Sequence, residues 1–378
     1  MKNYLIWAMG FLLTPLLANS QAVITITNPA PVTRTGELVS VAWKEVLAAY
    51  PGIDTAYFAV TNPVTGKQVP HQLEYNGEKS VQQLLLQVTI AAGAKQVLQI
   101  KKAKPQPFPS KTFCRYVPER KDDFAWENDK IASRAYGKAL ENTSEDAYGF
   151  DVWVKRTDQL VLDQRYRMGD YHNDHGDGMD YYHVGFSLGA GNIAPYANDS
   201  IWYSGNYRGW KILENGPLRS TFQLIYDEWN VAAQKVSVVK TLTIDAGSQL
   251  HKVEASYHFQ NTPVLPVVVG IVKRDQPGIT FFDEQKGLMA YWEPTDANNG
   301  TTGVGCLFTQ PVKNILVQKG QLLTLLEARP DKPVTYYRGA AWDKAAEITS
   351  AEQWFAYLQA FRKKQEFPVQ ITIKKSSR

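Results

Sequence analysis

Short extended segments separated by turn residues recur along most of the chain, and this pattern limits the fold more than any other feature. Residues 253–259 alternate between apolar and polar side chains, and residues 219–226 alternate in a similar way. A period of two residues is typical of a strand with one buried face. Residues 267–272 form a continuous apolar run, which indicates a strand covered on both faces. Turn-forming tripeptides lie between such segments: Asp245-Ala246-Gly247, Asn261-Thr262-Pro263 and Asn298-Asn299-Gly300.

Helical periodicity is thin in comparison. Residues 41–49 and 350–364 are the better helical stretches, so we expect an all-β fold with minor helix. With 44% hydrophobic residues and a formal net charge of +4, the 378-residue chain can bury a core, which excludes a disordered protein. The small net charge is spread thinly along the chain, so we expect no nucleic-acid partner.

A proline-rich stretch divides the chain into two expected units. Residues 102–111 (KAKPQPFPSK) combine prolines with polar spacers, as in a stiff extended linker. We therefore expect a small N-terminal β-sandwich over residues 23–105 and a larger unit over residues 106–378. The larger unit matches a large antiparallel β-sandwich whose concave face could hold an extended ligand.

The first residues predict export. Met1-Lys2-Asn3 is a short positive start, residues 4–17 are apolar, and small residues follow up to Ala22. This is the pattern of a signal peptide over residues 1–22. A membrane anchor is the weaker interpretation, because the run is shorter than about 18 uninterrupted apolar residues and Pro15 breaks it. We expect a periplasmic or secreted protein without a membrane span.

The two cysteines, Cys114 and Cys306, carry no clear chemistry. In an oxidising compartment they could pair, but their separation in space is not readable from the sequence. A zinc site would need more Cys or His ligands at close spacing. We interpret both as structural and leave the disulfide open.

The densest polar segment is Arg165 to Tyr182 (RYRMGDYHNDHGDGMDYY). Four carboxylates and two imidazoles lie within it, interleaved with glycines. Such groups need water, a cation or a substrate as partners, so we expect a loop at the mouth of a cleft. The alternative is an acidic surface loop without a role. His172 and His175 are the candidate bases, because imidazole titrates near neutral pH.

Metal binding by this loop is open. The spacing of His172 and His175 would suit a transition metal on a helix, but the glycines argue against a helix. Hard oxygen ligands suit calcium better, although the spacing lacks the glutamate that ends a helix-loop-helix calcium site. We expect no catalytic cofactor and regard a structural calcium ion as possible. Its candidate ligands are Asp170, Asn173, Asp174 and Asp177.

The glycine-rich segment from Gly185 to Gly191 resembles two well-known loops only superficially. No Gly-Lys-Ser/Thr follows it and no helix pattern begins there, so it is not a phosphate-binding loop. Ser187 stands in a Gly-x-Ser-x-Gly pattern, but an all-β setting does not supply the strand-turn-helix of a serine hydrolase. We expect these glycines to permit a tight turn or a bulge.

Islands of aromatic residues with arginine or amide groups predict a sugar-binding surface. Aromatic rings can stack on the C–H faces of sugars, and arginine can hold a carboxylate in a bidentate fork. The alternative is that these residues belong to the core or rim of a sandwich. The candidate substrate-binding residues are Trp126, Glu127, Asn128, Arg134, Tyr207, Trp210, Arg338 and Trp342.

These islands resemble, as a set, the domain-of-unknown-function family 4861. The resemblance covers nearly the whole chain after residue 22 and implies a role in breaking down uronic-acid-containing polysaccharides such as ulvan or rhamnogalacturonan. It also implies a reaction class, because a similar protein is an oligosaccharide dehydratase that leaves a 4,5-unsaturated uronate. We expect the larger unit to be a galactose-mutarotase-like supersandwich. The motifs that carry the resemblance are DFAWEND (123–129), RAYG (134–137), GMDYY (178–182), SLGAG (187–191), ENGPLR (214–219) and GAAW (339–342).

The residues available fit an elimination reaction. This chemistry needs groups that neutralise the uronate carboxylate, a base that takes the C5 proton, and an acid that protonates the leaving oxygen. Beside the two histidines, Tyr181, Tyr182 or Tyr203 can be the acid, and Arg134 or Arg208 can hold the carboxylate. A glycoside hydrolase of the same substrates and a non-catalytic carbohydrate-binding protein are the alternatives. The oligomeric state stays open.

Overall fold

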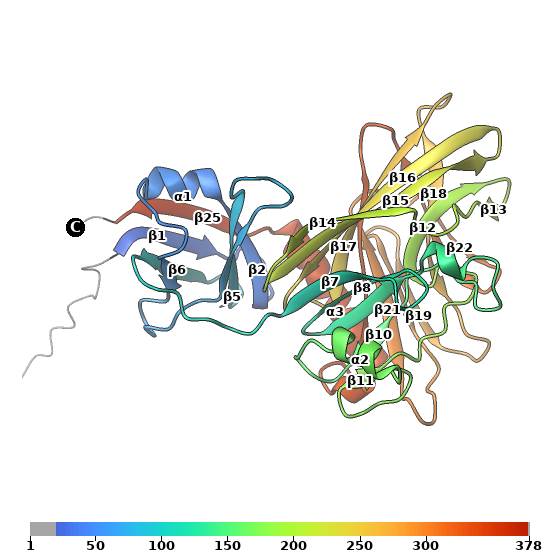
Figure 1. Cartoon of the computed structure of the whole chain (residues 1–378), viewed down its shortest axis with the longest axis horizontal. Coiled ribbons are helices and arrows are strands. Elements are labelled where there is room, and N and C mark those ends of the chain that lie inside the picture. The colour runs from blue at the N-terminus through green and yellow to red at the C-terminus, as the bar shows by residue number, and fades with distance from the viewer. Residues whose placement is uncertain (1–19, 377–378) are drawn as a thin grey trace, which may run out of the picture.

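The computed structural model describes residues 20–376 and shows two strand-rich units side by side (Figure 1). The smaller unit, on the left of the view, consists of two antiparallel sheets that enclose a small core. Ile24, Leu86 and Leu98 are fully buried there. Helix α1 (Trp43–Ala49) also packs into this core. The first sheet has the order β25 (Gln370–Lys375), β1 (Ser20–Thr27), β6 (Lys95–Lys101), β3 (Ala59–Thr61), and the second has the order β2 (Arg34–Ala42), β5 (Gln83–Ile90), β4 (His71–Glu74).

The N-terminal unit contains the last strand of the chain. Strand β25 pairs antiparallel with β1 along its length, from Gln370 opposite Thr27 to Lys375 opposite Ala22. The small sandwich predicted over residues 23–105 therefore also contains a segment that we had placed with the larger unit. Two distant segments meet here because β1 would otherwise expose its backbone N–H and C=O groups as a sheet edge.

The connection between the units follows the predicted linker. It runs from the end of β6 to β7 (Thr112–Val117). Gln106 is anchored to the small unit, because its N–H donates to Oε1 of Gln68 and its C=O accepts from Nε2 of Gln68, both at 2.8 Å. The end of the linker is held as well, because Lys111 donates from its backbone N–H to the carbonyl of Pro217 and from Nζ to Oε1 of Gln87, both at 2.8 Å.

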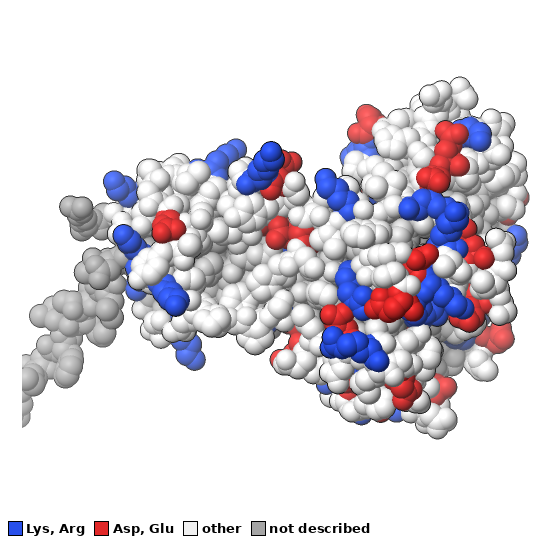
Figure 2. Space-filling model, in the orientation of Figure 1, with Lys and Arg blue, Asp and Glu red and all other residues white. Residues whose placement is uncertain are grey.

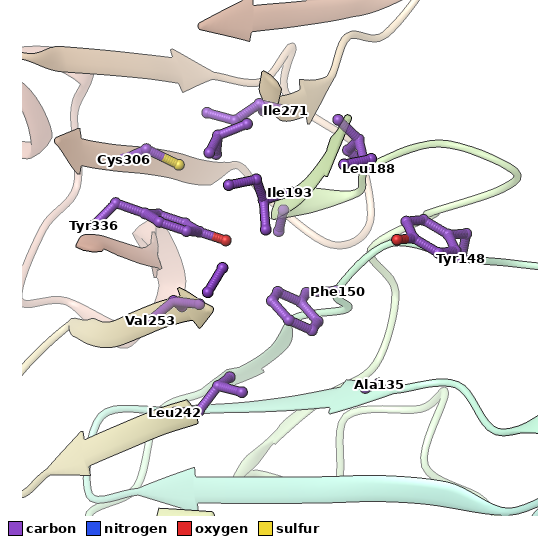
Figure 3. Packing of buried hydrophobic residues seen from close by; sticks show 14 of the residues in the cluster. Ala135, Tyr148, Phe150, Leu188, Ile193, Leu242, Val253, Ile271, Cys306 and Tyr336 are labelled. Carbon is purple, nitrogen blue, oxygen red and sulfur yellow. The ribbon is translucent and has the colours of Figure 1, made fainter. Parts of the chain in front are cut away.

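The larger unit is built from three antiparallel sheets whose buried faces share one core. Phe124 and Trp126 from the first sheet contact Phe222 of the long sheet, with ring centroids 4.3 and 5.2 Å apart. Figure 3 shows other side chains of this core, including Phe150, Ile193 and Tyr336. The sheets have the orders β11 (Gly178–Met179), β10 (Trp153–Lys155), β9 (Ile131–Ala135), β8 (Asp123–Asn128), β7; β13 (Ser200–Ile201), β12 (Ala190–Ala197), β18 (Leu265–Val272), β23 (Gln321–Ala328), β22 (Asn314–Gln318); and β14 (Gly209–Asn215), β15 (Arg219–Val231), β16 (Gln234–Asp245), β17 (Leu250–Phe259), β24 (Val334–Trp342), β21 (Thr302–Phe308), β20 (Leu288–Trp292), β19 (Ile279–Asp283).

The predicted strand pattern is confirmed residue by residue in the long sheet. In β15, Phe222, Leu224 and Tyr226 are buried, whereas the alternate residues Gln223 and Ile225 are less buried. Strand β17 shows the same alternation, and β18 is buried on both faces from Val267 to Ile271. The all-β class predicted from periodicity is therefore correct.

The predicted helices are also present, and one short helix was not expected. Helix α1 lies within the predicted residues 41–49. Helix α3 (Ala351–Glu366) covers most of the predicted residues 350–364, and its N-cap Ser350 accepts a hydrogen bond from the N–H of Gln353. Helix α2 (Leu162–Met168) contradicts the expectation of a loop at Arg165, and it ends at Gly169 in the left-handed conformation, with φ of 72°. The rest of the segment up to Asp177 is irregular, as the glycines predicted.

The glycine-rich segment provides a bulge, as expected. Gly189 and Gly191 have positive φ values of 61° and 91°. The register of β12 against β18 shifts between Ala190 and Asn192. A Cβ atom on Gly191 would lie 2.8 Å from Cβ of Arg338 and 2.9 Å from Sγ of Cys306. The glycines therefore serve backbone geometry and close packing.

The predicted signal peptide lies largely outside the described residues. Residues 1–19 are not described, and β1 begins at Ser20. Within residues 20–376, no helix is long and apolar enough to cross a membrane. Acidic and basic side chains are intermixed on the face shown in Figure 2.

The cysteines are free and buried. Cys114 lies in β7 and Cys306 in β21, and neither forms a disulfide. Burial raises the pKa of each thiol to about 12. Both thiols are therefore protonated at neutral pH and unreactive, which fits a structural role.

Candidate functional site

A polar cavity of about 580 Å³ lies where strands of two sheets of the larger unit end. The segment after β18 supplies Lys273 and Arg274, and the segment after β20 supplies Glu293. Tyr181 and His183, which follow β11 in the chain, form another wall. The cavity thus brings a carboxyl, a phenol, an imidazole and two cations together.

Glu293 is a buried carboxyl of this cavity. It is only 6% exposed, and Nε of Arg274 donates a hydrogen bond of 2.6 Å to its Oε1. Burial raises the pKa of Glu293 to about 7, and the neighbouring Arg274 opposes this shift. A carboxyl with a pKa close to neutrality can both accept and release a proton under physiological conditions.

Arg274 joins the walls of the cavity to each other. Its Nη1 donates to the backbone carbonyl of His183 at 2.6 Å, and its guanidinium lies over the ring of Tyr182, 4.6 Å from the centroid. Burial lowers the pKa of Arg274, whereas Tyr182 and Glu293 raise it. The raising effects together outweigh burial, so the pKa lies above its ordinary value. Its Nη2 has no hydrogen-bond partner within residues 20–376. Arg274 therefore stays charged and keeps one donor nitrogen, Nη2, for a ligand.

Tyr181 offers a neutral phenol. Its hydroxyl lies 2.5 Å from Oγ1 of Thr302, and its ring is 6.5 Å from that of Trp342. Burial raises the pKa of Tyr181, so the hydroxyl keeps its proton at neutral pH. His183, on the same segment, is exposed at the rim of the cavity.

A buried cluster of charged residues includes Asp180, the residue before Tyr181. Arg134 contacts three buried carboxylates: its Nε lies 2.7 Å from Asp151, its Nη2 2.7 Å from Asp180 and its Nη1 3.6 Å from Asp123. Burial raises the pKa of Asp123 to about 6 and also raises the pKa of Asp180, against the attraction of Arg134. One guanidinium therefore lies among three buried carboxylates, and Arg120 also pairs with Asp123 at 3.3 Å.

Two of the predicted site residues meet at this cluster. Nδ1 of His172 lies 2.9 Å from the backbone carbonyl of Asp180 and 3.6 Å from its Oδ2, while Arg134 holds the same carboxylate. His172 is exposed, whereas Arg134 is buried. The cluster holds Asp180, and the next residue is Tyr181 of the cavity wall.

The other charged residues of the predicted loop are held by neighbours within the protein. His175 is exposed and lies 3.0 Å from Asp170. The carboxylate of Asp174 accepts from the N–H groups of Gly176 and Gly178, and Asp177 pairs with Arg165. Of the proposed calcium ligands, Asn173 donates to Asp170 at 2.7 Å, whereas Asp174 and Asp177 have other partners. Within residues 20–376, no group of three or more His, Cys, Asp or Glu side chains is placed to hold a metal ion.

The remaining predicted catalytic residues lie outside the lining of the cavity. Arg208 pairs with Glu141 at 2.8 Å. The hydroxyl of Tyr203 accepts from Nε2 of Gln321 at 3.2 Å. Tyr182 is buried beneath Arg274, where its ring supports the guanidinium.

The first aromatic island is internal. Trp126 is fully buried and its indole N–H donates to Nδ1 of His251 at 3.0 Å. The carboxylate of Glu127 binds Lys155 at 2.7 Å and also accepts from backbone N–H groups at the start of α2. The amide of Asn128 donates to two backbone carbonyls. These contacts match the alternative interpretation, in which the island belongs to the core.

The other islands are mostly internal as well. Tyr207 and Arg338 are buried, and Arg338 donates to the carbonyl of Ala190 at 2.7 Å. Trp342 is also buried but contacts Tyr181, so it supports the cavity wall from behind. Trp210 is 43% exposed and stacks on Tyr116.

Sequence reasoning missed Glu293, Arg274 and His183. Arg274 and Glu293 each stand close behind an apolar strand, and a polar residue that directly follows a buried strand would have been the available signal. Neither residue lies in a dense motif. Only the folded chain places them within hydrogen-bond distance of each other.

The fold defines an all-β protein of two units, with a cavity lined by titratable groups where strands of the larger unit end. The chain belongs to the family described as "Domain of unknown function (DUF4861)", whose model matches residues 26–371. "Uncharacterized protein P7" from Formosa agariphila is 31% identical over 279 residues, which cover 69% of each of the two proteins. The predicted family is therefore confirmed.

Two solved structures resemble the chain in backbone arrangement. An alpha-mannosidase from Enterococcus faecalis V583 has 10% identity and a TM-score of 0.47 over 96% of this chain and 47% of its own. A protein of glycosyl hydrolase family 38 from Enterococcus faecalis has 10% identity and a TM-score of 0.48, with 96% and 48% covered. The chain spans about half the length of these structures.

Proposed function

We propose that this protein is a lyase or dehydratase of uronic-acid-containing oligosaccharides, of the ulvan or rhamnogalacturonan type. The observation that carries the proposal is Glu293, a buried carboxyl with a pKa of about 7 that lines an open cavity beside a cation and a phenol. Membership of the family, with the resemblance described above, supports the substrate class. The predicted signal peptide supports action in the periplasm or outside the cell.

The cavity supplies one group for each requirement of the elimination. Lys273 and the free Nη2 of Arg274 face the uronate carboxylate, which makes the C5 proton more acidic. Glu293 takes that proton, the C4–O bond breaks, and the electron pair of the C5–H bond forms the C4=C5 double bond. The leaving oxygen receives its proton from the hydroxyl of Tyr181 and departs as water or as a sugar hydroxyl.

The pH dependence of the reaction follows from Glu293. As the base, this carboxylate must be ionised, and burial raises its pKa to about 7. We expect kcat/KM to rise about tenfold per pH unit below about pH 7 and to level off above it. Initial rates across the acidic and neutral range measure this directly. A profile that is already flat two pH units below neutrality contradicts the assignment of Glu293.

Hydrolysis of the same substrates is the second candidate, because two further carboxylates, Asp275 and Asp296, line the cavity. A glycoside hydrolase needs two carboxyl groups on opposite sides of the bond. The mass of the products separates the reactions. Dehydration removes one water, elimination at a glycosidic bond leaves the total mass unchanged, and hydrolysis adds one water.

The same incubation tests the proposal as a whole. A conjugated C4=C5 double bond absorbs ultraviolet light, whereas hydrolysis and simple binding create no such chromophore. We expect absorbance to grow when the protein is incubated with oligouronides. Products that have gained water and show no new absorbance would establish the hydrolase instead, and an unchanged substrate would establish a binding protein.

A further inference from the structure

A second cavity, of about 600 Å³, lies between the two units. Its floor is the outer face of β15, β16 and β17, and its walls come from α3 and from the small unit. The smaller and larger units adjoin, and the surface is indented between them (Figure 2). None of the groups in the proposed elimination lines this cavity.

The floor carries a block of uncharged hydrogen-bonding side chains. Thr221 lies opposite Thr243 in the register of β15 and β16, and Gln223 lies opposite Thr241. These positions alternate with the buried core residues, so they share the outward face. Hydroxyl and amide groups each donate and accept, which is the chemistry that matches sugar hydroxyls.

The charges of the lining are compensated internally. Each of its cations is held in an ion pair with a carboxylate of the same lining. Arg219 binds Asp245 at 2.6 Å and Glu74 at 3.2 Å, Lys252 binds Glu254 at 2.9 Å, and Lys364 binds Glu37 at 3.2 Å. A ligand that carries carboxylates would therefore find no cation without an ion-pair partner in this lining. An uncharged ligand does not need such a cation.

One wall offers apolar ring surface. Tyr337 of β24 and Phe361 of α3 both line the cavity, with ring centroids 5.0 Å apart in an edge-to-face arrangement. The hydroxyl of Tyr337 donates to Oε1 of Gln365 at 3.4 Å. Aromatic faces that lie beside amide groups can pack against the C–H face of a sugar and bind its hydroxyls.

We propose that this cavity binds a neutral oligosaccharide, held between the two units. The block of uncharged side chains in the floor, the paired charges and the aromatic wall all favour a ligand rich in hydroxyl groups and free of carboxylates. This binding site is separate from the cavity of Glu293, and the inference does not depend on the proposed elimination. The interface between the units would thus bind a glycan.

Calorimetric titration of the full-length protein tests the proposal, with neutral tetrasaccharides of glucose, xylose, galactose and rhamnose as probes and tetragalacturonate as the acidic comparison. We expect saturable binding of at least one neutral probe. Thr241→Val removes a hydroxyl from the floor at constant shape, and we expect about tenfold weaker binding. Thr280→Val, at an exposed threonine of β19 outside the cavity, is the matched control and is expected to bind like the parent.

Two further variants complete the test. Gln223→Ala provides a second change in the floor, and circular dichroism checks that each variant is folded. Glu293→Gln is expected to bind the neutral probe as tightly as the parent protein, which separates this site from the proposed active site. Weakening by either floor variant supports the proposal. It is overturned if no neutral probe binds, if both floor variants bind unchanged, if Glu293→Gln abolishes binding, or if Thr241→Val weakens tetragalacturonate equally.

Discussion

Replacing Glu293 with glutamine is expected to lower kcat/KM of the proposed elimination by about 10² to 10⁴-fold, the usual contribution of a positioned general base. The amide keeps the shape of the side chain and can still contact Arg274, which donates to Oε1 at 2.6 Å in the parent protein. It cannot accept the C5 proton. Initial rates of product absorbance on an oligouronide measure the loss.

Asp275→Asn is the matched control for this variant. Asp275 lines the same cavity but is exposed, so the same change from carboxylate to amide is expected to alter kcat/KM less than about tenfold. If Asp275→Asn or Asp296→Asn lowers the rate as much as Glu293→Gln, that aspartate and Glu293 act as a pair of catalytic carboxylates. The proposed function then changes from lyase to hydrolase. If Glu293→Gln keeps full activity, Glu293 is not the base.

Replacing Arg134 with alanine is expected to lower the free energy of unfolding by about 3–5 kcal/mol, because removing one partner leaves buried carboxylates without compensation. Arg134 is the common partner of Asp123, Asp151 and Asp180, all of which are buried. Urea unfolding followed by tryptophan fluorescence measures the change. Arg208→Ala provides the control, since Arg208 and Glu141 are partly exposed and such a pair contributes only about 0–1 kcal/mol.

The loss in Arg134→Ala is expected to depend on pH. Burial already raises the pKa of Asp123 to about 6 in the parent protein, and removal of the guanidinium raises it further. A neutral carboxyl needs no counter-charge, so the deficit should shrink as the pH falls from the higher pKa of the variant towards about 6, and it should stay constant below that, where Asp123 is protonated in both proteins. A deficit that stays constant down to pH values near the ordinary aspartate pKa would show that lost packing, rather than lost charge compensation, destabilises the variant.

The two cavities differ in the charges that they leave free for a ligand, so we expect them to bind different ligands. Around Glu293, Lys273 and one nitrogen of Arg274 remain available to a ligand, whereas the cations of the interface cavity are all committed to carboxylates. An oligosaccharide with acidic and neutral stretches could thus use both sites of one molecule. The proposed reaction would then take place in one cavity while the other cavity binds a neutral part of the same glycan.

Much of the local structure was predictable because it follows from backbone geometry. Alternating side chains specify a half-buried strand, and β15 and β17 have the predicted faces. Gly189 and Gly191 adopt positive φ at the expected bulge. The motifs that carry the family resemblance proved to be largely internal, as Trp126 and Trp342 show.

The site was harder to predict, since density of polar residues is a property of the sequence and convergence is a property of the fold. The segment from Arg165 to Tyr182 contributes Tyr181 to the cavity, while His172 meets Arg134 at Asp180 and His175 stays in solvent with Asp170. Glu293, an isolated carboxylate after a strand, carried no signal of its own. Its pKa of about 7 arises from burial, and the neighbouring residues in the sequence do not indicate that burial.

The order of apolar and polar residues thus decided the strand-rich class, the turns and the family, because each depends on contacts within a few residues or on motifs of a few residues. Packing decided which groups can react together. Glu293, Arg274 and Tyr181 come from three distant segments, and the ends of two sheets bring them around one cavity. The physical reason is that desolvation and hydrogen-bond distance act through space, so chemistry at this site exists only once the sheets have closed on their common core.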